Sequence, residues 1–322
     1  MIAGDELAAW LRDRRAQSDT GEAMAEVAAR LRRLPCLERL GAELERARYE
    51  GAEAVLALAD AFVGTPGALT QVLGALIGAA AQDPYFRPDF PVASSEVHSG
   101  LLLFDRPALT LTLGVMSADA IAAKRAERKG GASLTFTGRR LVFHFIKGGG
   151  ATLSLWEAPG IGPGFTAGSS GSCRLVGRRR IEDGQKLAID GRRFTFIVEE
   201  AERDIVFVGA ETPLECGPLS VEYDSATLRF IGASSTDEAS SRTQMMLALL
   251  RMMDRRDAAP LFRELLRSEL FYARWQTMRE FVALDPAAAL PHLREMAAGD
   301  PHGEVRRAAA QTLARLFEKE PA

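Results

Sequence analysis

The chain has 322 residues, of which 47% are hydrophobic and 26% are charged, and its formal net charge is −3 at pH 7. A chain of this length can form two or three domains, each with its own core. The lack of a basic excess argues against a protein whose whole surface binds nucleic acid. The longest apolar run, residues 68–81, is shorter than the roughly 20 residues that a membrane-spanning helix needs, so we expect a cytoplasmic protein without a membrane segment.

The chain contains three cysteines, Cys36, Cys173 and Cys216, and no two of them form a CxxC pair. Disulfide frameworks and structural zinc sites need paired or closely spaced cysteines. We therefore expect neither of them, and the sequence predicts no cofactor.

Residues 1–82 predict an N-terminal helical domain of about five helices, because apolar residues recur on one face of each segment. Pro35, Gly51 and Gly64 separate these segments. Residues 83–91 then contain three prolines and three aromatic residues. This composition predicts a linker that follows an extended path and buries its aromatic rings.

Residues 92–235 change to an apolar pattern with a period of two. Leu109 and Leu111, for example, alternate with Thr110 and Thr112. Such alternation is typical of half-buried strands, and we expect about ten or eleven of them with short connections. This region therefore predicts an antiparallel β-sandwich or jelly roll.

The segment from Glu182 to Gly191, followed by Phe194, contains a glycine-aspartate turn that leads into an apolar strand. It resembles the turn and strand of cupin-type jelly rolls. Cupin enzymes bind their metal through two histidines separated by one residue, a glutamate and a distant third histidine. This chain has no such histidine pair, so the resemblance implies the fold without its metal chemistry.

Residues 236–322 return to a helical period, with segments near 241–254, 257–268, 271–283, 286–298 and 303–318. The last two segments resemble a HEAT repeat, in which Asp285-Pro286 opens the first helix and Asp300-Pro301 precedes the second. Residues 257–275 look like a divergent earlier copy. The resemblance implies a short helical arm at the end of an α+β multidomain chain.

His98 and His144 are the only histidines of the β region, and Glu96 is the acid nearest to His98. Two histidines and a carboxylate would suit a divalent metal such as non-haem iron. His144, however, shares a strand face with Val142 and Ile146, where a hydrogen-bonded core histidine is the more common arrangement. We predict no metal site and keep these three residues as the alternative.

The strongest functional signal of the β region is a local basic excess. Between residues 174 and 193, seven basic residues accompany three acidic ones, which leaves an excess of four positive charges. Arginine pairs with carboxylates or phosphates, so the patch could bind an acidic peptide or a nucleic acid backbone, or pair with acidic helices of the same chain. In the helical arm, arginine and aromatic residues combine as they do at binding hot spots. The residues predicted to bind a partner are Arg178, Arg179, Arg180, Arg192, Arg193, Arg274 and Trp275.

Four methionines, Met245, Met246, Met252 and Met253, lie on one predicted helix. Methionine-rich surfaces adapt to varied partners, but such clusters belong more often to a core. We expect these side chains to be buried.

These observations favour a non-enzymatic adaptor that binds a protein or peptide, for example as an accessory subunit of an enzyme. Two alternatives remain open. The first is a metal-dependent cupin-like enzyme that uses His98 and His144. The second is a sensor whose β-domain cavity binds a small ligand.

Overall fold

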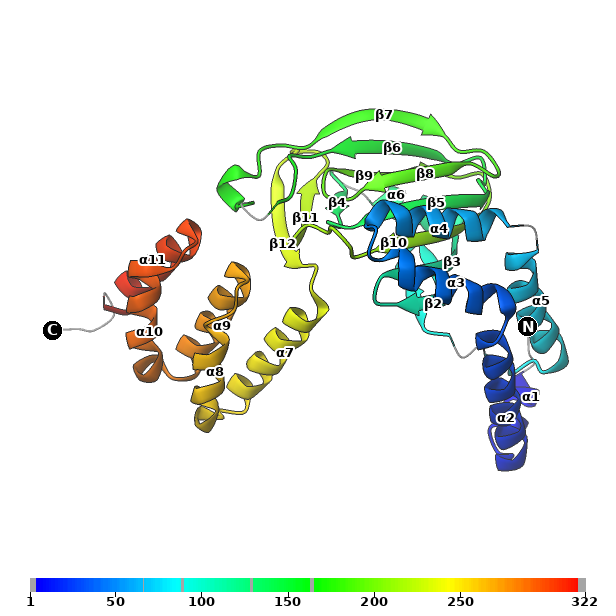
Figure 1. Cartoon of the computed structure of the whole chain (residues 1–322), viewed down its shortest axis with the longest axis horizontal. Helices are drawn as coiled ribbons and strands as arrows, with labels where there is room; N and C mark the ends of the chain where they lie inside the picture. Colours follow the sequence, from blue (N-terminus) through cyan, green and yellow to red (C-terminus); the bar gives the residue numbers. More distant parts are fainter. Residues whose placement is uncertain (1–3, 66, 88–89, 128–129, 163–164, 318–322) are drawn as a thin grey trace. The chain divides into compact units, whose positions relative to one another are not determined.

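The structure is a computed structural model that describes residues 4–65, 67–87, 90–127, 130–162 and 165–317. The chain folds into two compact units, whose elements are labelled in Figure 1. Unit 1 comprises Met1–Pro163 and Ser170–Gly232, and unit 2 comprises Gly164–Ser169 and Ala233–Ala322. Within the described ranges, no single helix has the length and apolar composition needed to cross a membrane.

Unit 1 begins with helices where the sequence predicts them. They are α1 (Gly4–Trp10), α2 (Arg14–Arg32), α3 (Pro35–Ala47), α4 (Ala52–Gly64) and α5 (Ala68–Gln82). The carboxylate of Asp13 accepts hydrogen bonds from the first backbone N–H groups of α2, as an N-cap does. Pro35 occupies the first turn of α3, where its missing N–H costs no hydrogen bond.

The segment that follows α5 buries its aromatic side chains, as the sequence predicts. Tyr85 stacks on Trp10 with 4.6 Å between the ring centroids. Phe86 and Phe90 pack against the core that the helices share with the sheet. Tyr85, Phe86 and Phe90 therefore attach the described residues of this segment to the N-terminal helices and the shared core.

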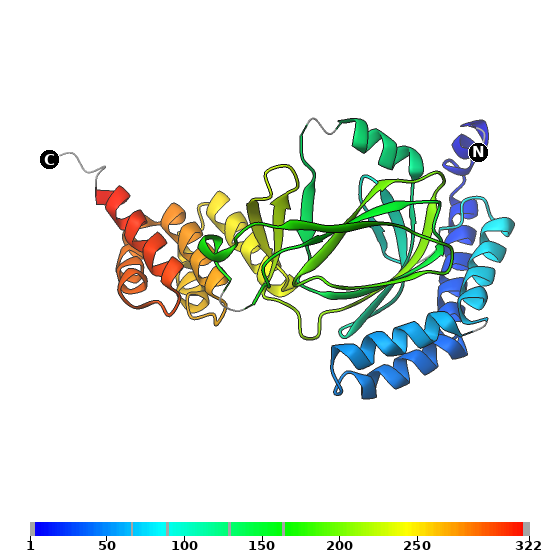
Figure 2. The same ribbon diagram turned by 90° about the horizontal axis from the view of Figure 1, so that it is seen from above.

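The strands of the described residues are β1 (Val92–Ser94), β2 (His98–Arg106), β3 (Leu109–Met116), β4 (Ser133–Phe136), β5 (Arg140–Lys147), β6 (Thr152–Glu157), β7 (Arg174–Arg180), β8 (Lys186–Asp190), β9 (Phe194–Glu200), β10 (Ile205–Thr212), β11 (Leu219–Asp224) and β12 (Phe230–Ser235), with helix α6 (Ala118–Glu127) between β3 and β4. They form a six-stranded sheet in the order β1-β2-β3-β10-β5-β8 and two three-stranded sheets, β12-β11-β4 and β7-β6-β9. The registered pairs are antiparallel. Figure 2 shows the strands, coloured from cyan through green to yellow, and the blue to cyan N-terminal helices on their outer side.

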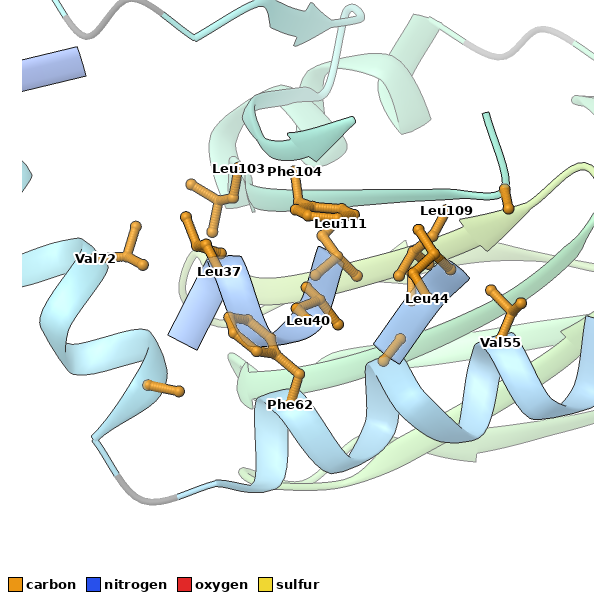
Figure 3. Close-up of a cluster of buried hydrophobic side chains, with 14 of the residues drawn as sticks. Leu37, Leu40, Leu44, Val55, Phe62, Val72, Leu103, Phe104, Leu109 and Leu111 are labelled. Atoms are coloured by element: carbon orange, nitrogen blue, oxygen red, sulfur yellow. The ribbon is translucent and has the colours of Figure 1, made fainter. Parts of the chain in front are cut away.

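One face of the six-stranded sheet is covered by the N-terminal helices. Leu40 and Leu44 of α3 share a buried cluster with Leu109 and Leu111 of β3 (Figure 3). Both leucines of β3 are fully buried. The helices of residues 1–82, which the sequence predicts as a helical domain, share this core with the sheet, because the sheet face is apolar and needs a second layer.

The opposite face of the same sheet forms the interior of the β-sandwich. Phe143, Phe145 and Phe207 pack there against Leu153 and Phe196 of the sheet β7-β6-β9. The rings of Phe143 and Phe196 meet edge to face at 5.1 Å, a favoured aromatic geometry. The six-stranded sheet is therefore apolar on both sides.

Unit 2 is a stack of helices: α7 (Glu238–Met252), α8 (Ala259–Leu265), α9 (Phe271–Leu284), α10 (Pro286–Gly299) and α11 (Gly303–Phe317). Helix α7 packs on α9, α9 packs on α10, and α10 packs on α11. Phe262, Met278, Phe281 and Leu293 are fully buried in its core. Each helix thus contributes one apolar face to a continuous core, as in helical repeats.

Candidate protein-interaction surface

The two histidines of the β region lie on opposite faces of the six-stranded sheet. His98 faces the sandwich interior, where it lines a cavity together with Phe143 and Phe207. Its Nδ1 lies 2.7 Å from Oγ of Ser95. His144 faces the N-terminal helices, because its Nε2 lies 3.0 Å from Oδ1 of Asp60 in α4. The structure does not bring the two imidazoles together.

His144 belongs to a small polar contact between α4 and the sheet. Its Nε2 is close to Asp60 but makes no hydrogen bond with it. Lys186 of β8 binds the same carboxylate at 2.6 Å. Burial lowers the pKa of His144, and Lys186 lowers it further against the opposing effect of Asp60. The imidazole is therefore neutral near pH 7, and the carboxylate pairs with the lysine.

Glu96, the third residue of the alternative metal set, is engaged elsewhere. Its carboxylate forms an ion pair with Lys124 of α6 at 2.7 Å, and this hydrogen bond lowers the pKa of Glu96. Among the described residues, no group of three or more histidine, cysteine, aspartate or glutamate side chains could hold a metal ion. The residues present do not fit the metal that a cupin-like fold would imply.

The arginines of the basic patch are largely engaged within unit 1. Arg174 and Arg193 both pair with the buried carboxylate of Glu157. Burial alone would raise the pKa of Glu157, but the two arginines lower it below its ordinary value. Arg192 binds Asp190 at 2.7 Å. The local positive charge predicted from the sequence is thus partly neutralised by acids that are close in space.

The three consecutive arginines of β7 differ in their contacts. Arg180 pairs with Glu202 at 2.6 Å, and Arg179 donates to the carbonyl of Lys186 at 3.3 Å. The side chain of Arg178 is exposed and, within the part of the chain that the structure describes, makes no hydrogen bond or ion pair. Of this run, Arg178 is therefore best placed to meet a partner.

The predicted partner-binding residues of unit 2 are not exposed: Arg274 is buried and Trp275 is half-buried. Arg274 is 9% exposed, and its guanidinium donates to both carboxylate oxygens of Asp300 at 2.8 and 2.7 Å. Trp275 packs against the helical core. Arg274 thus joins α9 to the turn before α11 and stabilises the stack.

A groove between α8 and α10 is lined in part by charged side chains that form no ion pair with the described residues of unit 2. Its volume is about 590 Å³, and Arg274 and Asp300 lie at its base. One wall is the end of α8, with Arg263, Leu266 and Arg267, and the other is one face of α10, with His292, Glu295, Met296 and Gly299. We call this site the α8–α10 groove.

The two arginines of the α8–α10 groove are exposed and lie one helical turn apart. Nε of Arg263 donates only to the carbonyl of Ala259 in its own helix, at 3.4 Å. Across the described residues, neither Arg263 nor Arg267 forms an ion pair with an acid. Glu295 of the opposite wall instead lies close to His292, with 3.5 Å between its Oε2 and the Nδ1 of the imidazole. Leu266 and Met296 supply apolar contact area beside these charges.

The methionines predicted to be buried are instead exposed. Met245, Met246, Met252 and Met253 have exposed fractions between 56 and 74%. Buried positions of the same helix, such as Leu247, face the core. The four methionines lie on one helix, as their spacing predicts, but on the side of α7 that faces away from α9.

The sequence reasoning did not identify Arg263, Arg267 or His292 as a site. The signal available was the spacing of the two arginines, four residues apart around Leu266. Such spacing is also typical of any solvated helix face. Only the fold brings His292 and Met296 of the next helix pair opposite them.

Residues 232–314 match the family model of HEAT repeats. The C-terminal region is therefore similar to HEAT repeats, in agreement with the resemblance of its Asp-Pro turns. HEAT repeats are helical repeats with a role in protein interaction. A search of the curated proteins gives no match.

Solved structures similar to the central region are cupin-fold proteins. Ectoine synthase from P. lautus is 12% identical with a TM-score of 0.22, and the match covers 38% of this chain and 68% of that protein. The Cnp3 cupin domain of Schizosaccharomyces pombe is 9% identical with a TM-score of 0.23, and coverage is 37% and 64%. A sugar phosphate isomerase of the cupin superfamily from Silicibacter pomeroyi is 12% identical with a TM-score of 0.24, and coverage is 46% and 87%.

Proposed function

We propose that this protein is a non-enzymatic adaptor whose HEAT-repeat region binds an acidic segment of a partner protein in the α8–α10 groove. The observation that carries the proposal is the pair of exposed arginines, Arg263 and Arg267, which have no acidic partner among the described residues. Arginine binds carboxylates through paired, charge-assisted hydrogen bonds. The match to HEAT repeats supports a protein as the partner.

The dimensions of the α8–α10 groove suit a short extended segment. The wall from His292 to Gly299 covers seven helical steps, which is about 10 Å at 1.5 Å per residue. About three extended residues have this length. A segment with two carboxylates and one apolar side chain would place its acids at Arg263 and Arg267 and its apolar group against Leu266 and Met296.

The test is the charge-reversal variant Arg263→Glu/Arg267→Glu, measured by fluorescence polarisation with a panel of labelled short peptides that contain adjacent Asp or Glu residues and a Leu. We expect wild-type protein to bind a subset of the acidic peptides and not their amide counterparts. The variant should bind at least tenfold more weakly, because each lost charged hydrogen bond contributes about 1.5–3 kcal/mol. Added salt should weaken wild-type binding.

Arg178→Glu is the matched control, because Arg178 is also exposed and without an ion-pair partner in the described chain but belongs to β7 of unit 1. Its binding should equal that of the wild type. Binding that survives reversal of the groove arginines and disappears in Arg178→Glu would place the acidic segment on β7 instead. Circular dichroism must first confirm that each variant is folded.

A second candidate function, a sensor for a small ligand, is supported by two cavities of unit 1. They have volumes of about 550 and 320 Å³, and His98 lines both. These volumes are typical of ligand sites, as are apolar walls with few polar groups. Met116 and Phe196 line the larger cavity, and Lys124 lies in the same wall, so a small apolar carboxylate would fit.

Hexanoate and octanoate are suitable probes for this second function, with the melting temperature of the full chain as the readout. A ligand that binds only the folded state raises the melting temperature. The increase should occur in metal-free buffer and be lost in Met116→Trp, which fills the cavity. An unchanged melting temperature in the wild type at millimolar probe would argue against this function.

A further inference from the structure

The outer side of α7 carries a stripe of large apolar side chains. Their exposed fractions are 73% for Met245, 59% for Met246, 47% for Leu249, 74% for Met252 and 56% for Met253. The other four follow Met245 by one, four, seven and eight positions, and together these five positions cover one side of an α-helix. We call these five residues the α7 stripe. Leu247 lies on the other side of the helix, where it is 1% exposed.

The two ends of the helical stack differ in their outer surfaces. In repeat proteins, the terminal repeats need a polar outer face to remain soluble. Helix α11 meets this requirement, since its exposed side chains include Arg306, Arg307, Gln311 and Arg315. Helix α7 does not, because its outer face is the α7 stripe. The α7 end of the stack therefore has the surface of an interface.

The order of the residues in the α7 stripe is symmetric about Leu249. Met245 and Met253 are each four positions from it, and Met246 and Met252 are each three positions from it. In a two-fold symmetric contact, residue i of one copy meets residue j of the other, and j meets i. Two antiparallel α7 helices that cross at Leu249 would set methionine against methionine at every other position.

The charges that flank the α7 stripe are compatible with this arrangement. At one end Arg242 pairs with Glu238 at 2.5 Å, and at the other end Arg256 pairs with Asp254 at 3.1 Å. The charged side chains that flank the stripe are therefore already paired within the chain, and an antiparallel approach sets the N-terminal end of one α7 against the C-terminal end of the other, so that like helix ends do not meet. Methionine side chains are unbranched and adapt to irregular surfaces, which helps identical surfaces to pack.

We propose that two copies of this chain associate through the α7 stripe as an antiparallel, two-fold symmetric helix pair. The stripe covers eight helical steps, about 12 Å at 1.5 Å per residue. One helix of this length offers less than the roughly 800 Å² per partner of a standard interface. The dimer is therefore expected to be weaker than one with a standard interface, and its formation does not depend on the α8–α10 groove.

Sedimentation velocity of the full chain over a range of concentrations tests the proposal. The mass should rise from 34.9 kDa to twice this value as the concentration increases. Leu249→Asp should raise the dissociation constant at least tenfold, because the two-fold axis places the two carboxylates against each other. Ile77→Asp is the matched control, since Ile77 is an equally apolar side chain, 67% exposed, on α5 of unit 1.

Cysteine cross-linking then tests the symmetry. In a Cys216→Ser background, which removes the exposed native thiol, Leu249→Cys should form a disulfide with itself across the axis. Met245→Cys should cross-link with Met253→Cys chains and poorly with itself. A chain that stays monomeric at all concentrations, a dimer unaffected by Leu249→Asp, or self-linking at Met245→Cys without linking at Leu249→Cys would each overturn the proposal.

Discussion

Replacing Arg274 with methionine is expected to lower the free energy of unfolding of unit 2 by about 3–5 kcal/mol, the usual cost of breaking a buried ion pair. The side chains of Arg274 and Asp300 are 11% and 4% exposed. The same guanidinium donates to the carbonyls of Ser268 and Glu269 at 2.9 and 3.0 Å. Its removal leaves a buried carboxylate without a counter-charge and two carbonyl groups without their donor.

Trp275 provides the readout for this prediction. The chain has three tryptophans, so a Trp10→Phe/Trp156→Phe background leaves a single fluorophore in unit 2. Urea unfolding should show the loss as a lower midpoint. Adding Asp300→Asn should recover part of the loss, because asparagine carries no charge and can still accept the hydrogen bond that the N–H of His302 donates to Asp300 at 2.8 Å in the wild type. A loss below about 1 kcal/mol would contradict a buried, stabilising pair.

The pH dependence of the same difference provides an independent check. Burial by itself raises the pKa of Asp300, but hydrogen bonds from Arg274 and from the N–H of His302 hold it below its ordinary value of 3.8. A carboxyl group whose pKa is lower in the folded state than in the unfolded state stabilises the folded state at pH values above the unfolded pKa. This contribution is lost as the pH falls through the pKa of the folded state. Without Arg274, burial raises the pKa of Asp300, so the advantage of the wild type over the variant should be complete only above that raised pKa and should decrease as the pH falls from there through the lowered pKa of the wild type.

Periodicity in the sequence identified the elements but not what each face contacts. The alternation around Leu109 and Leu111 correctly predicted strands, and the Asp-Pro turns near residues 285 and 300 correctly predicted a HEAT-repeat region. The pattern could not show that α3 and α4 cover the same leucines, because an apolar face has the same sequence signature whichever layer covers it.

The methionines of α7 illustrate the same limit on sequence reasoning. Their spacing defines one face of a helix, and a buried stripe and an exposed stripe have identical spacing. Burial depends on whether another helix lies opposite, and α7 is the first helix of its stack. The basic patch shows the same limit for charges, because Glu157 is distant in sequence from Arg174 and Arg193 and becomes their partner only in the folded sheet.

The proposed groove and the proposed dimer contact would reinforce each other. Both lie on unit 2, and a two-fold dimer would present two α8–α10 grooves. A partner with two acidic segments would then bind the second groove intramolecularly, which increases the apparent affinity without any new contact. Leu249→Asp should weaken binding of such a bivalent partner while leaving the affinity for a single short peptide unchanged.

Replacing Leu44 with alanine is expected to destabilise the β-sheet of unit 1 by about 2–5 kcal/mol, although Leu44 belongs to helix α3. Leu44 and Leu109 are buried in the same cluster, with exposed fractions of 2% and 0%. The cavity left by Leu44→Ala therefore removes contacts from β3 as well as from the helices. Leu109→Ala should lower the stability of the same cooperative transition by a similar amount.

Trp156 of β6 reports on this transition in a Trp10→Phe/Trp275→Phe background. Urea unfolding should shift to a lower midpoint in both Leu44→Ala and Leu109→Ala. Phe281→Ala, a fully buried position of unit 2, is the control that should leave the Trp156 transition unchanged. If residues 1–82 were a separate domain, Leu44→Ala would leave Trp156 unaffected, whereas one shared core requires that a cavity under the helices weakens the strands.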